Sequence, residues 1–194
     1  MKKTFWIALF ILISALGFFV NYWMQTQPIW IVHAKVDETS WPSTPLKNLM
    51  ILNYIEEYGS FLAPDYEKVV CTEFLIKVIS AYTPLSNVEK NQIRIITNDN
   101  LVQLIENEST PIKGVQTALI QNNKGRKLDI AEVMPGDFVQ FWNTYRGEVY
   151  GHCGVVLDID PDQSITLYSS HPLTGGYGKQ VFLWPDKVYF VRLK

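Results

Sequence analysis

The segment HCGVVLDI, residues 152–159, decides the fold: an apolar run follows directly on one of three histidines and one of two cysteines. Its β-branched and apolar residues are typical of a strand that packs into a core. Three more segments of this kind follow Gly125, namely GDFVQFW (136–142), QSITLYSS (163–170) and KVYFVRLK (187–194). Asp-Pro-Asp at 160–162 predicts a hairpin turn. We therefore expect an antiparallel sheet in the C-terminal part of the chain.

Helical patterns occupy the chain before this sheet. Residues 46–59 (LKNLMILNYIEEYG) form an amphipathic pattern, which predicts a helix that ends at Gly59. Residues 69–82 (VVCTEFLIKVISAY) are apolar nearly all round, which predicts a helix buried on most sides. Shorter helices are expected after a capping box at 86–90, at 100–107 and at 114–122. Helices first and an antiparallel sheet second indicate an α+β fold.

The composition restricts the class of protein. The 194 residues are 47% hydrophobic and carry 17 basic and 19 acidic side chains, for a formal charge of −2. The charges are spread along the chain and form no basic stripe, so we expect no nucleic-acid partner. The length suits one domain, over residues 46–194, together with an extra N-terminal segment.

The N-terminus has the plan of a membrane-targeting segment. Two lysines at positions 2 and 3 precede an uncharged apolar run from Phe5 to Val20, so residues 1–24 are expected to form a signal-anchor helix. The lysines should stay in the cytoplasm and the rest of the chain should be exported. Residues 25–45 contain three prolines and are predicted to be a linker. We expect a retained anchor; the alternative is a cleaved signal and a secreted or periplasmic protein.

The two cysteines allow opposite interpretations. In an oxidising compartment the default is a disulfide between Cys71 and Cys153. A thiol nucleophile instead needs a histidine beside it, and the histidine needs a group that orients its ring. Cys71 on the buried helix, His152 at the head of a strand and His171 on the next strand suit these roles. A third interpretation is that Cys71 is a small core residue.

Strand alternation separates the cysteine interpretations. Adjacent residues of a strand point to opposite faces, so His152 and Cys153 must diverge. If His152 faces the central helix and Cys71, Cys153 is expected to face away from both the helix and Cys71. The disulfide and the catalytic pair then exclude each other. The same divergence argues against a zinc site at this position, so we expect no metal.

At these residues the chain resembles a family. PGDFVQFW, then GHCGVVLD, then a polar residue on the following strand is similar to the C-terminal half of NlpC-type cysteine endopeptidases, which are papain-like bacterial enzymes. KGRKLDIAEVMPGDFVQF (124–141) also resembles their approach to the first core strand. The resemblance covers about residues 64–175. Around the nucleophile the chain departs from the family, with Val-Cys-Thr-Glu at 70–73 in place of Asp-Cys-Ser-Gly, and residues 84–112 are expected to be an insertion.

The resemblance implies a catalytic set and a substrate. Cys71 would be the nucleophile, His152 its base and His171 the orienting residue, with Ser169 and Ser170 as alternatives for the last role. The implied substrate is the peptide of peptidoglycan, met on the outer side of the bacterial inner membrane, and no cofactor is required. We expect a monomer. The residues expected to bind substrate are Tyr66, Glu73, Trp142, Gly151 and Ser170.

Two alternatives to this peptidase remain open. An amidase or an acyltransferase would use the same scaffold and differ in what attacks the thioester. A catalytically inert wall-binding or interaction module would retain the architecture without a reactive thiol. The reactivity of Cys71 distinguishes this module from the enzymes.

Overall fold

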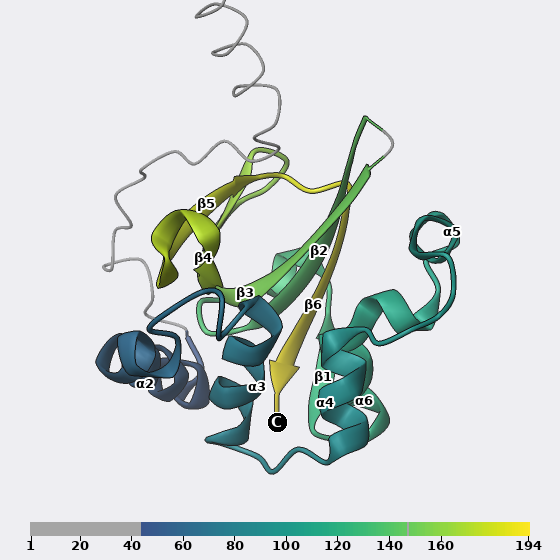
Figure 1. Ribbon diagram of the computed structural model, residues 1–194. Helices are drawn as coiled ribbons and strands as arrows, with labels where there is room; N and C mark the ends of the chain where they lie inside the picture. Colours follow the sequence, from purple (N-terminus) through teal and green to yellow (C-terminus); the bar gives the residue numbers. More distant parts are fainter. Residues whose placement is uncertain (1–43, 147) are drawn as a thin grey trace, which may run out of the picture. The chain divides into compact units, whose positions relative to one another are not determined.

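The computed structural model describes residues 44–146 and 148–194, and Figure 1 labels its elements. The helices are α2 (Leu46–Leu62), α3 (Cys71–Ser80), α4 (Asn87–Arg94), α5 (Leu101–Glu106) and α6 (Gly114–Gln121). The strands are β1 (Gly125–Leu128), β2 (Phe138–Tyr145), β3 (Glu148–Asp160), β4 (Ser164–His171), β5 (Gly176–Leu183) and β6 (Lys187–Leu193). Short 3-10 turns are η2 (Thr110–Lys113), η3 (Ile130–Glu132) and η4 (Pro172–Thr174).

The six strands form one sheet in the order β1-β6-β2-β3-β4-β5. Every neighbouring pair is antiparallel. Figure 1 shows α3 beside β3 with α2 next to it, and α4 and α6 together near β1. The predicted α+β class is therefore confirmed.

Four of the strands lie where their sequence pattern predicts them, and two were not predicted. β2, β3, β4 and β6 overlap the four segments, and the turn at 160–162 closes with the Gln163 N–H donating to the Asp160 carbonyl at 3.0 Å. The prediction that His152 stands at the head of its strand is wrong, because β3 already begins at Glu148, where it pairs with the end of β2. β1 is only four residues long, and β5 begins in a glycine-rich stretch, so neither has a strong strand pattern of its own. Both exist because β6 and β4 provide a backbone ladder along their length.

Most of the helix predictions are also confirmed. The capping box is present at the start of α4, where Ser86 and Glu89 exchange side-chain and backbone hydrogen bonds. The prediction that the first helix ends at Gly59 is wrong, because α2 continues to Leu62. A Cβ at position 59 would lie 2.5 Å from the ring of Tyr177, so the glycine provides room for that ring instead of ending the helix.

The sheet has two different buried faces. On the face that α2 and α3 cover, Phe138, Cys153, Val155 and Leu157 pack in one cluster with residues of both helices. On the other face the rings of Phe141, His152, His171 and Phe182 contact one another. His152 and Cys153 therefore point to opposite faces, as strand alternation requires.

Part of the predicted N-terminal organisation cannot be compared with the structure. The signal-anchor helix (1–24) and all but the last two residues of the linker (25–45) lie outside the described residues. α2 begins at Leu46, directly after the predicted linker. No helix within residues 44–194 is long and apolar enough to span a bilayer.

A fully buried carboxylate ties α2 to the sheet. Asp137 accepts two hydrogen bonds from the Arg192 guanidinium, at 2.7 and 2.6 Å, and one from Asn48 Nδ2 at 2.8 Å. Its second oxygen also accepts from the Met134 N–H at 2.8 Å, which fixes the turn before β2. Asp137 is 0% exposed, so all of these contacts are shielded from water.

Replacing Asp137 by alanine should lower the free energy of unfolding by about 3–5 kcal/mol, because it leaves the guanidinium of Arg192 without its partner in a site that is largely buried. Urea unfolding followed by circular dichroism measures this. The matched control is Arg126→Ala, which breaks a pair with Glu132 whose side chains are 45% and 46% exposed, and should cost less than about 1 kcal/mol. Equal costs for the two variants would contradict the role assigned to Asp137.

Candidate active site

Cys71 is the first residue of α3. Val70 before it is extended and gives no side-chain cap, and the first backbone bond of the helix runs from the Phe74 N–H to the Val70 carbonyl at 3.0 Å. The N–H groups of residues 71–73 are therefore not used within the helix, and their partial positive charge favours an anion at this end. The Ser170 hydroxyl donates to the Val69 carbonyl, which holds this end of the helix against β4.

The sheet is open where the helix begins. The ladder between β3 and β4 runs from the Val155–Tyr168 pair to the Asp160–Ser164 pair. Before Val155, β3 pairs with β2, as in the pair of Cys153 with Gln140, while β4 continues on β5. The N–H of Cys153 is beside this opening, and it contributes to the lowering of the pKa of the Cys71 thiol.

The surroundings of Cys71 favour its thiolate. The pKa of the Cys71 thiol is held well below its ordinary value, chiefly by a hydrogen bond from the Cys153 thiol, then by the charge and hydrogen bond of His152 and by the Cys153 N–H; burial opposes them. The pKa of Cys153 is raised well above its ordinary value by complete burial and by Cys71. Cys71 is therefore the thiol that ionises, and Cys153 stays protonated.

Both cysteines are free. The expectation that Cys153 faces away from the helix and Cys71 is wrong, because Cys153 lies in the helix-covered cluster against which Cys71 packs, while the ring of His152 lies on the other face with Phe141 and Phe182. Alternation still separates the side chains of His152 and Cys153. The start of α3 is held against β4 by Ser170, and α3 contacts both β3 and β4, whose ladder reaches only as far as Val155.

The ring of His152 is fixed from several sides. It is 7% exposed and packs against Phe182 and Phe141, with ring centroids 4.9 and 5.8 Å away. Its Nε2 lies 2.8 Å from the Ser169 hydroxyl oxygen. Because Nε2 is engaged with Ser169, Nδ1 is the ring nitrogen left to exchange a proton with Cys71.

His171 lies beside His152 but does not orient it through a hydrogen bond. The two rings meet edge to face with centroids 5.3 Å apart, and His171 Nδ1 accepts from the Leu173 N–H at 3.2 Å. Burial, followed by the charge of His152, lowers the pKa of His171 to about 4, so its ring is neutral near pH 7. Ser169, one of the two alternatives, makes the contact that was expected of His171.

The residues expected to bind substrate have different positions. Tyr66 is half-buried, and burial, followed by the charges of Cys71 and Cys153, raises the pKa of its phenol. Glu73 forms an ion pair with Arg94, whose Nη2 lies 3.0 Å from Glu73 Oε2, and this pair joins α3 to α4. Ser170 is 0% exposed and is used to hold the start of α3.

Trp142 and Gly151 form one packing unit. Trp142 is 6% exposed, and its Nε1 donates to the Ile112 carbonyl at 2.9 Å. A Cβ at Gly151 would lie 2.4 Å from the Trp142 ring, so the close approach expected at this glycine is made by a side chain of the protein itself. Trp142 packs with Ile105 and Tyr189, in a cluster formed by α5, η2 and the sheet. Trp142, which was expected to bind substrate, thus packs against the segment 84–112.

Sequence reasoning missed Gln180 at this site. Its Oε1 accepts from the Ser169 hydroxyl, and it is 1% exposed. Gln180 lies on β5, which has a weak strand pattern, and no motif includes it. An isolated glutamine in an unassigned segment provides no signal from which a site role can be predicted.

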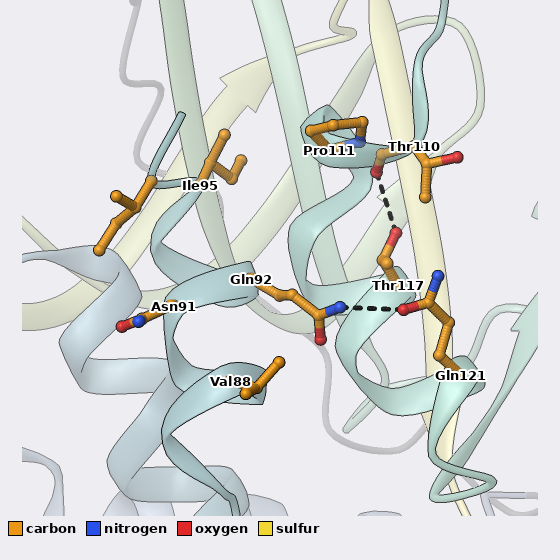
Figure 2. A pocket seen from close by; sticks show the side chains of 9 residues that line it. Val88, Asn91, Gln92, Ile95, Thr110, Pro111, Thr117 and Gln121 are labelled. Atoms are coloured by element: carbon orange, nitrogen blue, oxygen red, sulfur yellow. Dashed lines mark hydrogen bonds between the residues drawn. The ribbon is translucent and has the colours of Figure 1, made fainter. Parts of the chain in front are cut away.

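A separate hollow lies between α4 and α6 and has a volume of about 390 Å³. Figure 2 shows Gln92 bonded to Gln121 across it and Thr117 bonded to Thr110 at one end. None of its lining residues belongs to the group around Cys71. Within residues 44–146 and 148–194 we also find no cluster of three histidine, cysteine or acidic residues that could hold a metal ion.

Comparison with models of protein families, with curated protein sequences and with solved structures gave no match to this chain.

At pH 7, iodoacetamide should modify Cys71 and leave Cys153 intact in the folded chain. The lowered pKa of Cys71 makes its thiolate available, whereas Cys153 is 0% exposed and its pKa is raised. Mass spectrometry of the two cysteine peptides measures the rates, and urea-unfolded chain, in which both should react alike, is the control. Faster labelling of Cys153, or no free thiol before reduction, would contradict this assignment.

Proposed function

We propose that this chain is a papain-like cysteine hydrolase of the NlpC type that cleaves amide bonds in peptidoglycan stem peptides. The observation that carries the proposal is a thiol of lowered pKa at a helix N-terminus, beside a buried imidazole whose far nitrogen is held by a hydroxyl. Acyl transfer by a cysteine requires these three parts in contact. The PGD turn before β2 and the GHCG segment in β3 are the two motifs of the family resemblance.

The proposed reaction begins with proton exchange between Cys71 and His152. The thiolate attacks the carbonyl carbon of the scissile amide, and His152 protonates the leaving amine. A water molecule then gives a proton to His152 and attacks the thioester, which releases the acid and restores the thiol. No cofactor takes part.

The negative oxygen of the tetrahedral intermediate needs donors close to the sulfur. The N–H of Cys71 is free of intrahelical bonds at the start of α3, and we propose it as the first donor. The charge of Cys71 acts on the pKa of the Tyr66 phenol, and we propose this phenol as the second donor. Glu73 is not proposed to contact substrate, because Arg94 binds its carboxylate.

The place of action is proposed from the N-terminal sequence. Residues 1–24 would anchor the protein in the bacterial inner membrane, with the hydrolase on the outer side as a monomer. Peptidoglycan is met on that side of the membrane, so location and proposed substrate agree. A cleaved signal would leave the same domain soluble outside the membrane.

An amidase or acyltransferase remains the second enzymatic candidate, because Cys71 and His152 would form the same thioester in either case. They differ in the molecule that accepts the acyl group from the thioester. Adding a primary amine such as glycinamide should yield only hydrolysed product from a hydrolase, and an amide adduct from an acyltransferase. An inert wall-binding module would give neither product, and its Cys71 would react slowly with iodoacetamide.

The decisive test is release of new amino and carboxyl groups from purified peptidoglycan by the full-length chain in detergent. Cys71→Ala and His152→Ala should each lower the rate by at least about 10³-fold, because each removes a group that forms or breaks bonds. His33→Ala, in the predicted linker, is the control for loss of a histidine. Unchanged release from Cys71→Ala would exclude the proposed function.

A further inference from the structure

We propose that Gln180 is a positioning residue that holds His152 in the tautomer whose proton is on Nε2, so that Nδ1 presents a lone pair to Cys71. The proposal rests on the proposed function of the Cys71–His152 pair and adds how that pair is prepared to react. It concerns a row of four hydrogen-bonded side chains, His152, Ser169, Gln180 and Thr174. The row runs across β3, β4 and β5 and ends, through Thr174 of η4, on backbone carbonyls of β4 and β5.

The register of the sheet brings these side chains together. Ser169 on β4 is opposite Gly178 on β5, so Gln180 is its diagonal neighbour on the same face. His152, Ser169 and Gln180 are 7%, 0% and 1% exposed. Water therefore does not compete for their hydrogen bonds, and each group must be satisfied within the chain.

The direction of these hydrogen bonds is set by Thr174, the residue farthest from His152. The Thr174 hydroxyl, which has one proton, contacts the carbonyls of Gly176 at 2.6 Å and His171 at 3.1 Å. Carbonyl oxygens only accept, so Thr174 must donate in this direction. Its oxygen is then an acceptor toward Gln180 Nε2, which lies 2.8 Å away.

That contact fixes the amide of Gln180, and the amide fixes Ser169. With its nitrogen on Thr174, Gln180 directs Oε1 at the Ser169 hydroxyl, which must donate its single proton to it. The Ser169 oxygen can then only accept from His152 Nε2, at 2.8 Å. The Nε2 nitrogen must therefore carry the proton, and Nδ1 is the basic nitrogen.

This arrangement explains why the orienting group need not be charged. In the reaction His152 takes a second proton on Nδ1, and its Nε2–H continues to donate to Ser169 without rearrangement. A neutral chain thus selects the tautomer by the direction of its donors. A carboxylate at the position of Ser169 would select the same tautomer through its negative charge.

The test is the tautomer of His152 in the full-length, ¹⁵N-labelled chain in detergent. The sequence has three histidines, so long-range ¹H–¹⁵N spectra of the imidazoles can be assigned with one substitution each. The wild type should show His152 protonated at Nε2. In Gln180→Leu the Ser169 hydroxyl is free to donate to Nε2, so the Nδ1–H tautomer should appear and iodoacetamide labelling of Cys71 at pH 6.5 should fall about tenfold, as for a thiol pKa one unit higher.

Three further variants separate positioning from a loss of packing. Gln140→Leu removes another buried glutamine, 3% exposed, from β2, which β3 and β4 separate from the strand of Gln180, and should leave the His152 tautomer unchanged. Gln180→Glu keeps an acceptor for Ser169 and should retain the Nε2–H tautomer. Thr174→Val, at an exposed turn position, frees the amide of Gln180 to rotate and should give a mixture even if Gln180→Leu does not fold.

Two outcomes would overturn the inference. One is an unchanged His152 tautomer and an unchanged labelling rate in folded Gln180→Leu or, if that variant does not fold, in Thr174→Val. The other is a wild-type His152 protonated at Nδ1. Failure of the proposed function can be told apart from failure of this inference. An unreactive Cys71 in the wild type would exclude the hydrolase, whereas the spectra would still show which nitrogen of His152 carries the proton.

Discussion

The site depends on one contact, the docking of the N-terminus of α3 into the opening between β3 and β4. The Ser170 hydroxyl binds the Val69 carbonyl from β4, and the Cys153 N–H on β3 helps to lower the pKa of the Cys71 thiol. Both groups are available because the ladder between these strands ends at Val155. A fully paired sheet would have used the Cys153 N–H in its own hydrogen bonds and would have left no place for the helix end between the strands.

This opening also explains how two adjacent residues with opposite orientations serve the same sulfur. His152 approaches Cys71 from the face that holds Phe141 and Phe182, and Cys153 approaches from the helix-covered face. Cys153 forms and breaks no bond in the reaction that we propose. Its contribution is the hydrogen bond that, with His152, makes Cys71 the acidic member of the pair.

The polar groups behind His152 show why a buried site needs complete hydrogen bonding. Ser169 and Gln180 are almost fully buried, and each donor among them has an acceptor up to the carbonyl of Gly176. An unpaired buried polar group would cost about 1–3 kcal/mol, so such a chain is stable only when every member is satisfied. This requirement gives a chain of neutral side chains a definite direction.

The sequence by itself determined the fold class, four of the six strands, the central helix and the capping box, because each of these depends on local periodicity and turn chemistry. It also singled out Cys71 and His152, from residue type and motif. Only the tertiary structure decided that Ser169, not His171, hydrogen-bonds the ring of His152, that Gln180 binds Ser169, and that Cys71 packs against the cluster that contains Cys153. These facts depend on strand register and on where the ladder between β3 and β4 ends, and both arise from pairing between segments distant in the chain. Gly59 and Trp142 show the same limit, since their roles depend on rings from other parts of the fold.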